Sequence, residues 1–424
     1  MVAGAAEKIH GQVAKEDHRI GGVCCELRNV MISTPALWCD IRLVGTEETK
    51  HPLLNEQIKR TRNHPIRLLI HRRKVETSGD SKGGAATGEV LACLIASAPR
   101  WTEATIMVDV AYIPMFAGIR GHLAQLQYLD LRVLGPLNGS SPSPMSGHPF
   151  ELAPALRELG IHTANQVKVP MDQITLLFGT HSTPLHRVLV CGARNLVDLR
   201  FSPGSHSYLE EFTTSPMTLP KVRRLYCPAL AFLRMVILPA LEELALATTH
   251  HVRHFEHFLI QSPETCITKL TITHASWDCI ASMEKLLWAS KGTTSLVICL
   301  RPEDNDILRA LTMRASGGTV GLRIESITVV LDGCLDVGGF DGTEELEKMI
   351  TSRMCIGEEA CAQLRSIQIS SAALPTTFCA RLVALRGKGL EVTFLDFVHD
   401  AAEHTWGEVW ESPLHETRIM ATRV

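Results

Sequence analysis

A short pattern of alternating large apolar residues returns many times along the chain. In Leu129-Asp130-Leu131 and Leu244-Ala245-Leu246, a small or polar residue separates two large ones. The full set of these triplets begins at Leu129, Leu159, Leu199, Leu244, Leu270, Leu296, Ile327, Ile367 and Val392. Alternation with a period of two predicts strands, each with one buried face.

Helical patterns lie between these strands. Ile307, Leu308 and Leu311 fall on one helical face ahead of two glycines, and Phe378 and Leu382 do the same ahead of Gly387. Each of these helices is followed directly by the next strand. Alternating helix and strand predicts a parallel sheet with helices outside it.

The spacing of the units indicates a repeat architecture. Leu244, Leu270 and Leu296 follow one another at intervals of 26 residues, whereas other intervals are longer. Several units carry L-x-x-L-x-L spacing, as in Leu126, Leu129 and Leu131, which resembles a leucine-rich repeat. The predicted fold class is therefore α/β, an irregular leucine-rich-repeat-like solenoid in which each unit buries its apolar side against its neighbours.

The same alternation continues toward the N-terminus in a less regular form. Residues 53–58 suit a helix, residues 66–70 a strand, and residues 106–110 a second strand with Val110 inward. Residues 77–88 are rich in Gly, Ser and Ala, so they are predicted to form a flexible linker.

Composition excludes several classes of protein. The 424 residues include 42 Lys plus Arg and 45 Asp plus Glu, so the net charge is −3 and offers no global attraction for nucleic acid or an anionic membrane. Hydrophobic residues make up 45% of the chain, which is too much for a disordered protein. No apolar run approaches the roughly 18 residues that span a bilayer. Residues 1–18 contain no apolar core of the kind found in a signal peptide.

Cysteine usage favours a reducing compartment. The 13 cysteines are scattered, odd in number and without a CxxC pair, so neither a disulfide framework nor a zinc knuckle is predicted. Together with the absent signal peptide pattern, this predicts an intracellular protein, cytoplasmic or nuclear.

Residues 23–43 carry the most specific motif. They read V-C-C-E-L-R-N-V-M-I-S-T-P-A-L-W-C-D-I-R-L. This segment resembles the second half of an F-box, and the S-T-P-x-L-W string is its most specific part. The A-P-R-W-T stretch near Trp101 and the leucine-rich segments up to about residue 250 are similar to a fungal F-box family with leucine-rich-like C-terminal regions.

The resemblance implies a substrate-recruiting subunit of a Skp–cullin–F-box ubiquitin ligase. By this resemblance, the residues that would bind the Skp-type adaptor are Leu27, Val30, Pro35, Leu37, Trp38 and Ile41. Two departures are plain: Met1 to Ile20 contains no L-P-x-E-I-L-type opening helix, and position 27 is Leu where the family usually has Trp. We therefore expect the chain as written to bind the adaptor weakly or not at all.

The physical interpretation of this segment leaves two alternatives open. Its apolar residues form either a knob that docks a partner helix or a cap over the first repeat. The predicted organisation is a polar tail over residues 1–20, a partial F-box-like segment with a short helix over 21–45, an α/β array over 46–394 and a C-terminal tail over 395–424. The alternative function is a leucine-rich-repeat-like scaffold that binds a protein partner without any ubiquitin-ligase link.

Other candidate chemistry is weaker. His250, His251, His254 and His257 have ligand-like spacing, but no HExxH motif is present, and we interpret them as a solvated helix. Residues 59–74 hold seven Lys or Arg residues, a pattern that can contact nucleic-acid phosphates. No aromatic residue lies between Trp38 and Trp101 to stack on bases, so we interpret this stretch as a solvated helix face followed by the end of a strand. No P-loop, nucleophile elbow or triad is recognisable. The prediction is a non-enzyme with no metal, no cofactor, no nucleic acid and no membrane partner.

A client protein is predicted to bind the strand positions that alternate with the buried ones. If the large residues of each triplet point inward, their neighbours face solvent. The predicted client-binding residues are Tyr128, Asp130, Arg132, Asp198, Arg200, Lys269, Thr271, Thr273 and Gln368. A merely solvated sheet face is the alternative.

Overall fold

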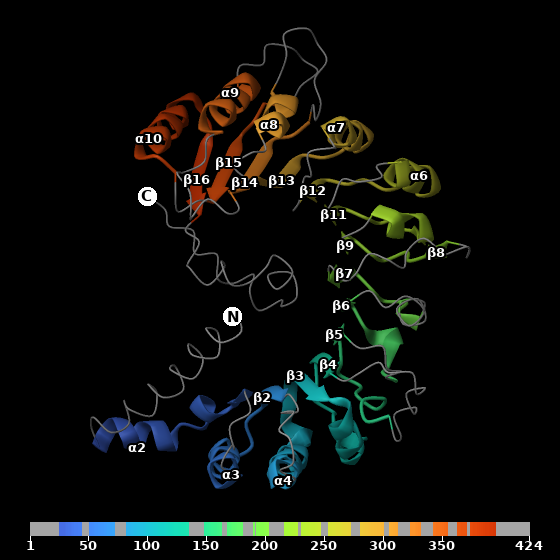
Figure 1. Cartoon of the computed structure of the whole chain (residues 1–424), viewed down its shortest axis with the longest axis vertical. Coiled ribbons are helices and arrows are strands. Elements are labelled where there is room, and N and C mark those ends of the chain that lie inside the picture. The colour runs from blue at the N-terminus through green and yellow to red at the C-terminus, as the bar shows by residue number, and fades with distance from the viewer. Residues whose placement is uncertain are drawn as a thin grey trace. The chain divides into compact units, whose positions relative to one another are not determined.

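The structure is a computed structural model of the whole chain (Figure 1). It describes residues 25–44, 51–72, 82–134, 148–162, 168–180, 190, 192–202, 216–227, 230–246, 253–272, 280–300, 305–312, 323–331, 342–354, 363–370 and 374–395. The chain divides into two compact units, Met1–Leu196 and Val197–Val424, and each is described by itself.

In its described residues, the first unit is a mixed α/β structure with six parallel strands in chain order. The strands are β1 (Asp40–Val44), β2 (Ile66–Arg72), β3 (Trp101–Asp109), β4 (Tyr128–Leu134), β5 (Glu158–Ile161) and β6 (Leu176–Thr180). The α-helices are α2 (Cys25–Ser33), α3 (His51–Arg60) and α4 (Lys82–Ala96). The 3-10 helices are η1 (Pro35–Trp38), η2 (Ala98–Arg100), η3 (Val110–Ile119) and η4 (Met171–Gln173).

The core of this unit lies between the strands and helices α3 and α4, which share one face of the sheet (Figure 1). Ile41, Leu68, Ile106 and Leu131 are fully buried or nearly so, and they alternate with residues that point to the other face. Each strand pairs with the next strand in the sequence, and the pairing of β2 with β3 shifts register between Ile66 and Arg67.

The described part of the second unit contains a sheet of eight parallel strands, again in chain order. They are β7 (Asp198–Ser202), β9 (Arg224–Cys227), β11 (Glu243–Leu246), β12 (Lys269–Ile272), β13 (Ser295–Leu300), β14 (Ser326–Leu331), β15 (Ser366–Ser370) and β16 (Glu391–Leu395). Two short strands, β8 (Met217–Thr218) and β10 (Val236–Ile237), pair separately.

Helices cover one face of this second sheet (Figure 1). They are α6 (Arg253–Gln261), α7 (Ile280–Ala289), α8 (Asn305–Leu311), α9 (Thr343–Met354) and α10 (Thr376–Ala384), with the 3-10 helices η6 (Leu230–Met235) and η8 (Leu385–Lys388). The apolar triplets supply the sheet side of the core, because Leu244, Leu270, Leu296 and Ile327 are buried and occupy one register row.

Several helices are followed immediately by a buried hydroxyl residue that caps the helix end. Thr61 Oγ1 donates to Ile58 O at 2.6 Å, Ser97 Oγ to Leu94 O at 2.7 Å, and Ser290 Oγ to Leu286 O at 2.7 Å. Each hydroxyl thus adds a hydrogen bond to a carbonyl in the last turn of its helix, and the carbonyls of Leu94 and Leu286 also accept the backbone N–H of Ser97 and Ser290. The same local solution recurs in both units, as expected of repeated helix–strand segments.

The sequence-based elements are largely confirmed. All nine triplets lie in or overlap described strands, and the helices expected near Ile307 and Phe378 are α8 and α10. The linker predicted for residues 77–88 is wrong from Lys82 onward, because α4 begins there. Val110 is not inward in a strand but half exposed at the start of η3. The sheet begins at Asp40, earlier than the array expected from residue 46.

Candidate functional site

The segment that resembles an F-box folds as α2, η1 and β1 in direct succession. Trp38, at the end of η1, donates from its indole Nε1 to the carbonyl of Met31 in α2 at 2.7 Å. The guanidinium of Arg60 lies 4.6 Å from the centre of the Trp38 ring, which is cation–π geometry. Trp38 therefore joins α2 to the last turn of α3.

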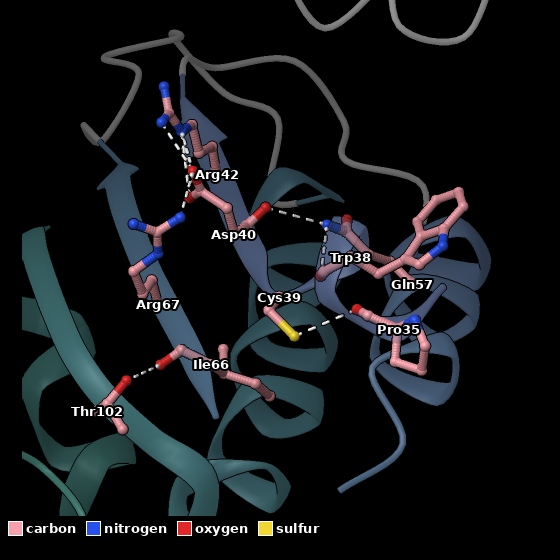
Figure 2. A network of polar contacts seen from close by, with 9 residues as sticks. All are labelled: Pro35, Trp38, Cys39, Asp40, Arg42, Gln57, Ile66, Arg67 and Thr102. Atoms are coloured by element: carbon pink, nitrogen blue, oxygen red, sulfur yellow. Dashed lines mark hydrogen bonds and ion pairs between the residues drawn. The ribbon is translucent and has the colours of Figure 1, made fainter. Parts of the chain in front are cut away.

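Polar contacts continue from this joint into the first two strands (Figure 2). Gln57 of α3 donates from Nε2 to the carbonyls of Trp38 and Asp40, at 3.3 and 3.2 Å. The Asp40 carboxylate pairs with Arg42 at 2.8 Å and with Arg67 at 3.9 Å. These contacts place η1 and β1 at a defined position on α3.

Cys39 is the junction between η1 and β1. Its thiol donates to the carbonyl of Pro35 at 3.3 Å (Figure 2). Burial raises the pKa of the Cys39 thiol, while the positive charges of Arg100 and Arg67 act in the opposite direction. The thiol is therefore a structural donor here rather than an activated nucleophile.

Exposed apolar side chains gather on the elements around this joint. Val30 and Ile32 of α2 are 57% and 40% exposed, Leu37 of η1 is 59% exposed, and Leu53 of α3 is 66% exposed. Because η1 contacts both α2 and α3, these side chains belong to adjoining elements. Large apolar side chains that are exposed to solvent on adjoining elements are typical of a protein-interaction surface. We call Val30, Ile32 and Leu37 the N-terminal apolar surface.

The residues that the F-box resemblance assigned to adaptor binding have different positions. Val30 and Leu37 are exposed, and Pro35 and Trp38 are half-buried. Ile41 is a correction: it is fully buried in β1, because its side chain packs in the core of the first sheet, so it cannot contact a partner. The backbone of Leu27 lies in α2, and its side chain lies outside the described part of the structure.

A second candidate surface is the face of the strands that points away from the helices, which we call the helix-distal face. In the first unit it carries Tyr128, Leu176 and Phe178, which form one buried cluster. The Tyr128 and Phe178 rings stack with centroids 5.9 Å apart. Gly160 makes this possible, because a Cβ there would lie 2.4 Å from the Phe178 ring.

Charged groups flank this aromatic cluster. Asp130 lies 3.3 Å from Arg132 and 3.4 Å from His162, and its carboxylate is almost fully buried. Burial raises the pKa of the Tyr128 phenol, and the negative charge of Asp130 raises it further. The Tyr128 hydroxyl therefore stays protonated and serves as a hydrogen-bonding group.

In the second unit the helix-distal face carries ion pairs and then hydroxyl groups. Asp198 pairs with Arg200 at 2.7 Å and with Arg224 at 3.1 Å, and Glu243 pairs with Lys269 at 3.3 Å. Further along the same register row stand Ser295, Ser326 and Ser366, with a 2.9 Å hydrogen bond between the last two. Thr328 Oγ1 donates to Gln368 Oε1 at 3.4 Å in the next row.

The predicted client-binding residues share this face but differ in exposure. Gln368 is exposed, Lys269 and Arg132 are half-buried, and Thr273 lies outside the described residues. The prediction that the remaining positions face solvent is wrong. Those buried residues are Tyr128, Asp130, Asp198, Arg200 and Thr271. The aromatic stack accounts for the burial of Tyr128, and salt bridges satisfy the buried charges of Asp130, Asp198 and Arg200.

Sequence reasoning missed the partners that build both candidate surfaces. In the sequence, Gln57 falls in the predicted helix and Arg60 in the basic stretch. Nothing in their spacing indicates that they contact Trp38. Phe178 was not assigned to any surface, although a weak triplet ending at Leu176 lies just before it. Long-range packing, rather than local pattern, brings these residues together.

Metal chemistry finds no support in the described residues. No group of three or more His, Cys, Asp or Glu side chains is placed there to hold a metal ion. Of the four clustered histidines, His254 and His257 lie in α6, and His250 and His251 lie outside the described residues.

Two findings complete the description of the chain. No helix in the ranges given above is both long and apolar enough to cross a membrane. No protein-family model matches the chain, and no curated protein matches it significantly.

Proposed function

We propose that the chain recruits client proteins to a Skp–cullin–F-box-type ubiquitin ligase, with α2 and η1 as the adaptor-docking segment. The observation that carries the proposal is the N-terminal apolar surface. It lies in the segment whose S-T-P-x-L-W string resembles an F-box, and it leaves Val30 and Leu37 more than half exposed. Trp38 and Arg60 hold this surface on the first helix of the array.

In this proposal the adaptor binds to α2 and η1. Ile41 does not contact the adaptor, because its side chain packs in the core of the first sheet. The adaptor set is therefore Val30 and Leu37 at the centre, with Pro35 and Trp38 as supports. Because Val30 and Leu37 are a little over half exposed, burying the rest of each side chain on docking supplies about 1–2 kcal/mol, which contributes to a micromolar affinity.

The client surface in this proposal is the exposed part of the helix-distal face in the second unit. It includes Lys269 and Gln368 and the hydroxyl row from Ser295 to Ser366. The mixture of paired charges, hydroxyl groups and an amide suits a protein or peptide client.

Adaptor titration tests the proposal. Purified Skp-type adaptor is titrated against the 424-residue chain and against the same chain preceded by an L-P-x-E-I-L-type helix, with affinity measured by biolayer interferometry. We expect weak or undetectable binding by the first form and at least tenfold tighter binding by the second, about 1.4 kcal/mol.

The decisive variant is V30D/L37D in the helix-extended chain, which places charges on the N-terminal apolar surface. Its matched control is Leu152→Asp, because Leu152 is also exposed and lies elsewhere in the first unit. The proposal requires that only V30D/L37D loses adaptor binding. Absence of binding by the helix-extended chain, or equal effects of the two variants, contradicts it.

A second candidate function is a repeat scaffold without any ubiquitin link, and one observation favours it. Ile41, which belongs to the F-box-like segment, is buried in β1, so the end of that segment is part of the sheet itself and serves the array. In this case neither the 424-residue chain nor its helix-extended form binds the adaptor, so V30D/L37D has no adaptor binding to remove.

A further inference from the structure

The last strand, β16, has a backbone edge that faces away from the sheet. Glu391 donates its N–H to the carbonyl of Arg365 at 2.8 Å, so Glu391 and Thr393 turn their backbone groups toward β15. Because backbone groups alternate in direction along a strand, those of Val392 and Phe394 point away from β15. No described strand pairs with this outer edge.

A side chain occupies this edge. Arg386 of η8 donates from Nη2 to the carbonyl of Val392 at 2.6 Å. The helical turn that carries Arg386 ends just before the strand, and Leu390 N–H bonds back to Leu385 at 3.4 Å. The guanidinium is thereby placed on the outward carbonyl at the middle of β16.

The first strand of the other unit has the same arrangement. Arg67 donates its N–H to the carbonyl of Cys39 at 2.9 Å, so Cys39 and Ile41 face β2 and the backbone of Asp40 points away. Gln57 Nε2 donates to that outward Asp40 carbonyl at 3.2 Å (Figure 2). Two unrelated side chains, one from α3 and one from η8, thus each cap one outward carbonyl of a terminal strand, Asp40 in β1 and Val392 in β16.

We propose that Arg386 and Gln57 close the sheet edges against strand addition by a second copy of this chain. An uncapped edge is a template for pairing with another strand. Val392, Thr393 and Phe394 are all residue types that favour strands. Two identical β16 edges would meet antiparallel around a twofold axis, so a second copy is the partner that always carries a matching edge.

The caps work through hydrogen bonding and, at β16, through charge. An incoming strand must displace the Arg386 guanidinium from the Val392 carbonyl and bury a charge beside it, which is costly. At β1 it must displace the Gln57 amide, which also bonds to the carbonyl of Trp38. The proposal does not depend on adaptor or client binding.

Sedimentation of the full chain tests the β16 cap. Arg386→Ala is compared with Lys388→Ala, which removes the same charge from the same helical turn. We expect the wild type and Lys388→Ala to sediment at 46.7 kDa and Arg386→Ala to shift toward twice that mass as concentration rises. Circular dichroism checks that each variant is folded, and Arg386→Met, which keeps an unbranched stem without a donor, provides a second variant if Arg386→Ala is not.

Residue-level hydrogen exchange locates the contact. In the associated form the outward amides of Val392 and Phe394 gain protection, whereas those of Glu391 and Thr393, already bonded to β15, do not change. A folded Arg386→Ala or Arg386→Met that stays monomeric, or that associates without protecting these two amides, overturns the proposal.

The β1 cap is tested by Gln57→Ala, which removes the amide donor without placing a charge beside the edge. Asn55→Ala, two residues earlier on α3, removes another amide side chain from the same helix and is the control. Association by Gln57→Ala alone supports the proposal, and equal behaviour of the two variants contradicts it for this edge.

Discussion

At the scale of single residues, Gly160 shows how one missing side chain shapes the helix-distal face. A Cβ at this position would lie 2.4 Å from the Phe178 ring and 2.9 Å from Asp130 Oδ1. Gly160→Ala should therefore push the ring away from Tyr128 and lower the free energy of unfolding by about 1–3 kcal/mol, measured by urea denaturation. Gly387→Ala is the control, since nothing lies within 4 Å of its Cβ position. Equal stability of the two variants would show that the aromatic stack is not constrained by Gly160.

Cys39 provides a second prediction at the residue scale. Because burial raises the pKa of its thiol, less thiolate is present at a given pH than for an ordinary cysteine. Alkylation by iodoacetamide at pH 8, followed by mass spectrometry, should modify exposed Cys266 first, Cys39 later, and buried Cys227 and Cys299 last. The rate at Cys39 should rise about tenfold per pH unit below its pKa, as the thiolate fraction does. Labelling of Cys39 as fast as Cys266 at pH 8 would contradict this.

At the scale of elements, the joint between α2, η1 and α3 depends on the Trp38 indole. Trp38→Phe keeps an aromatic ring beside Arg60 and removes the N–H that bonds to Met31, a loss of about 1 kcal/mol. We expect faster hydrogen exchange of the α2 amides with little change in β2 and β3. Leu37→Ala is the control, because Leu37 is exposed on the same short helix. Unchanged exchange in α2 would mean that other contacts hold this helix.

The strands show which elements local pattern predicts and which it does not. Triplets such as Leu270-Thr271-Ile272 are buried on one side and paired in register, so alternation alone identified them. Ile41-Arg42-Leu43 has the same alternation, yet it follows directly on a motif that resembles a helical F-box, and the strand β1 was not predicted. The linker expected at residues 77–88 is wrong from Lys82 onward because three glycines, two alanines and a threonine there continue into an apolar helix.

At the scale of the whole molecule, the candidate surfaces were only partly predictable. Strand alternation placed Tyr128, Asp130 and Arg200 on the helix-distal face but could not show that they are buried. Their burial arises from residues distant in the sequence, such as Phe178 across Gly160 and Arg224 against Asp198. The F-box resemblance likewise predicted an adaptor-binding surface in the N-terminal segment. Only the packing of the folded chain shows that Leu37 is exposed and Ile41 is buried.

The most direct test of the proposed function is hydrogen exchange of the helix-extended chain with and without excess Skp-type adaptor. The account predicts added protection in the peptides that cover Cys25–Ser33 and Pro35–Trp38, with none in β13 to β16. The same experiment on V30D/L37D should show no protection in that segment. Adaptor binding that protects other elements and leaves α2 and η1 unchanged, or no protection anywhere, would contradict the assignment of this surface.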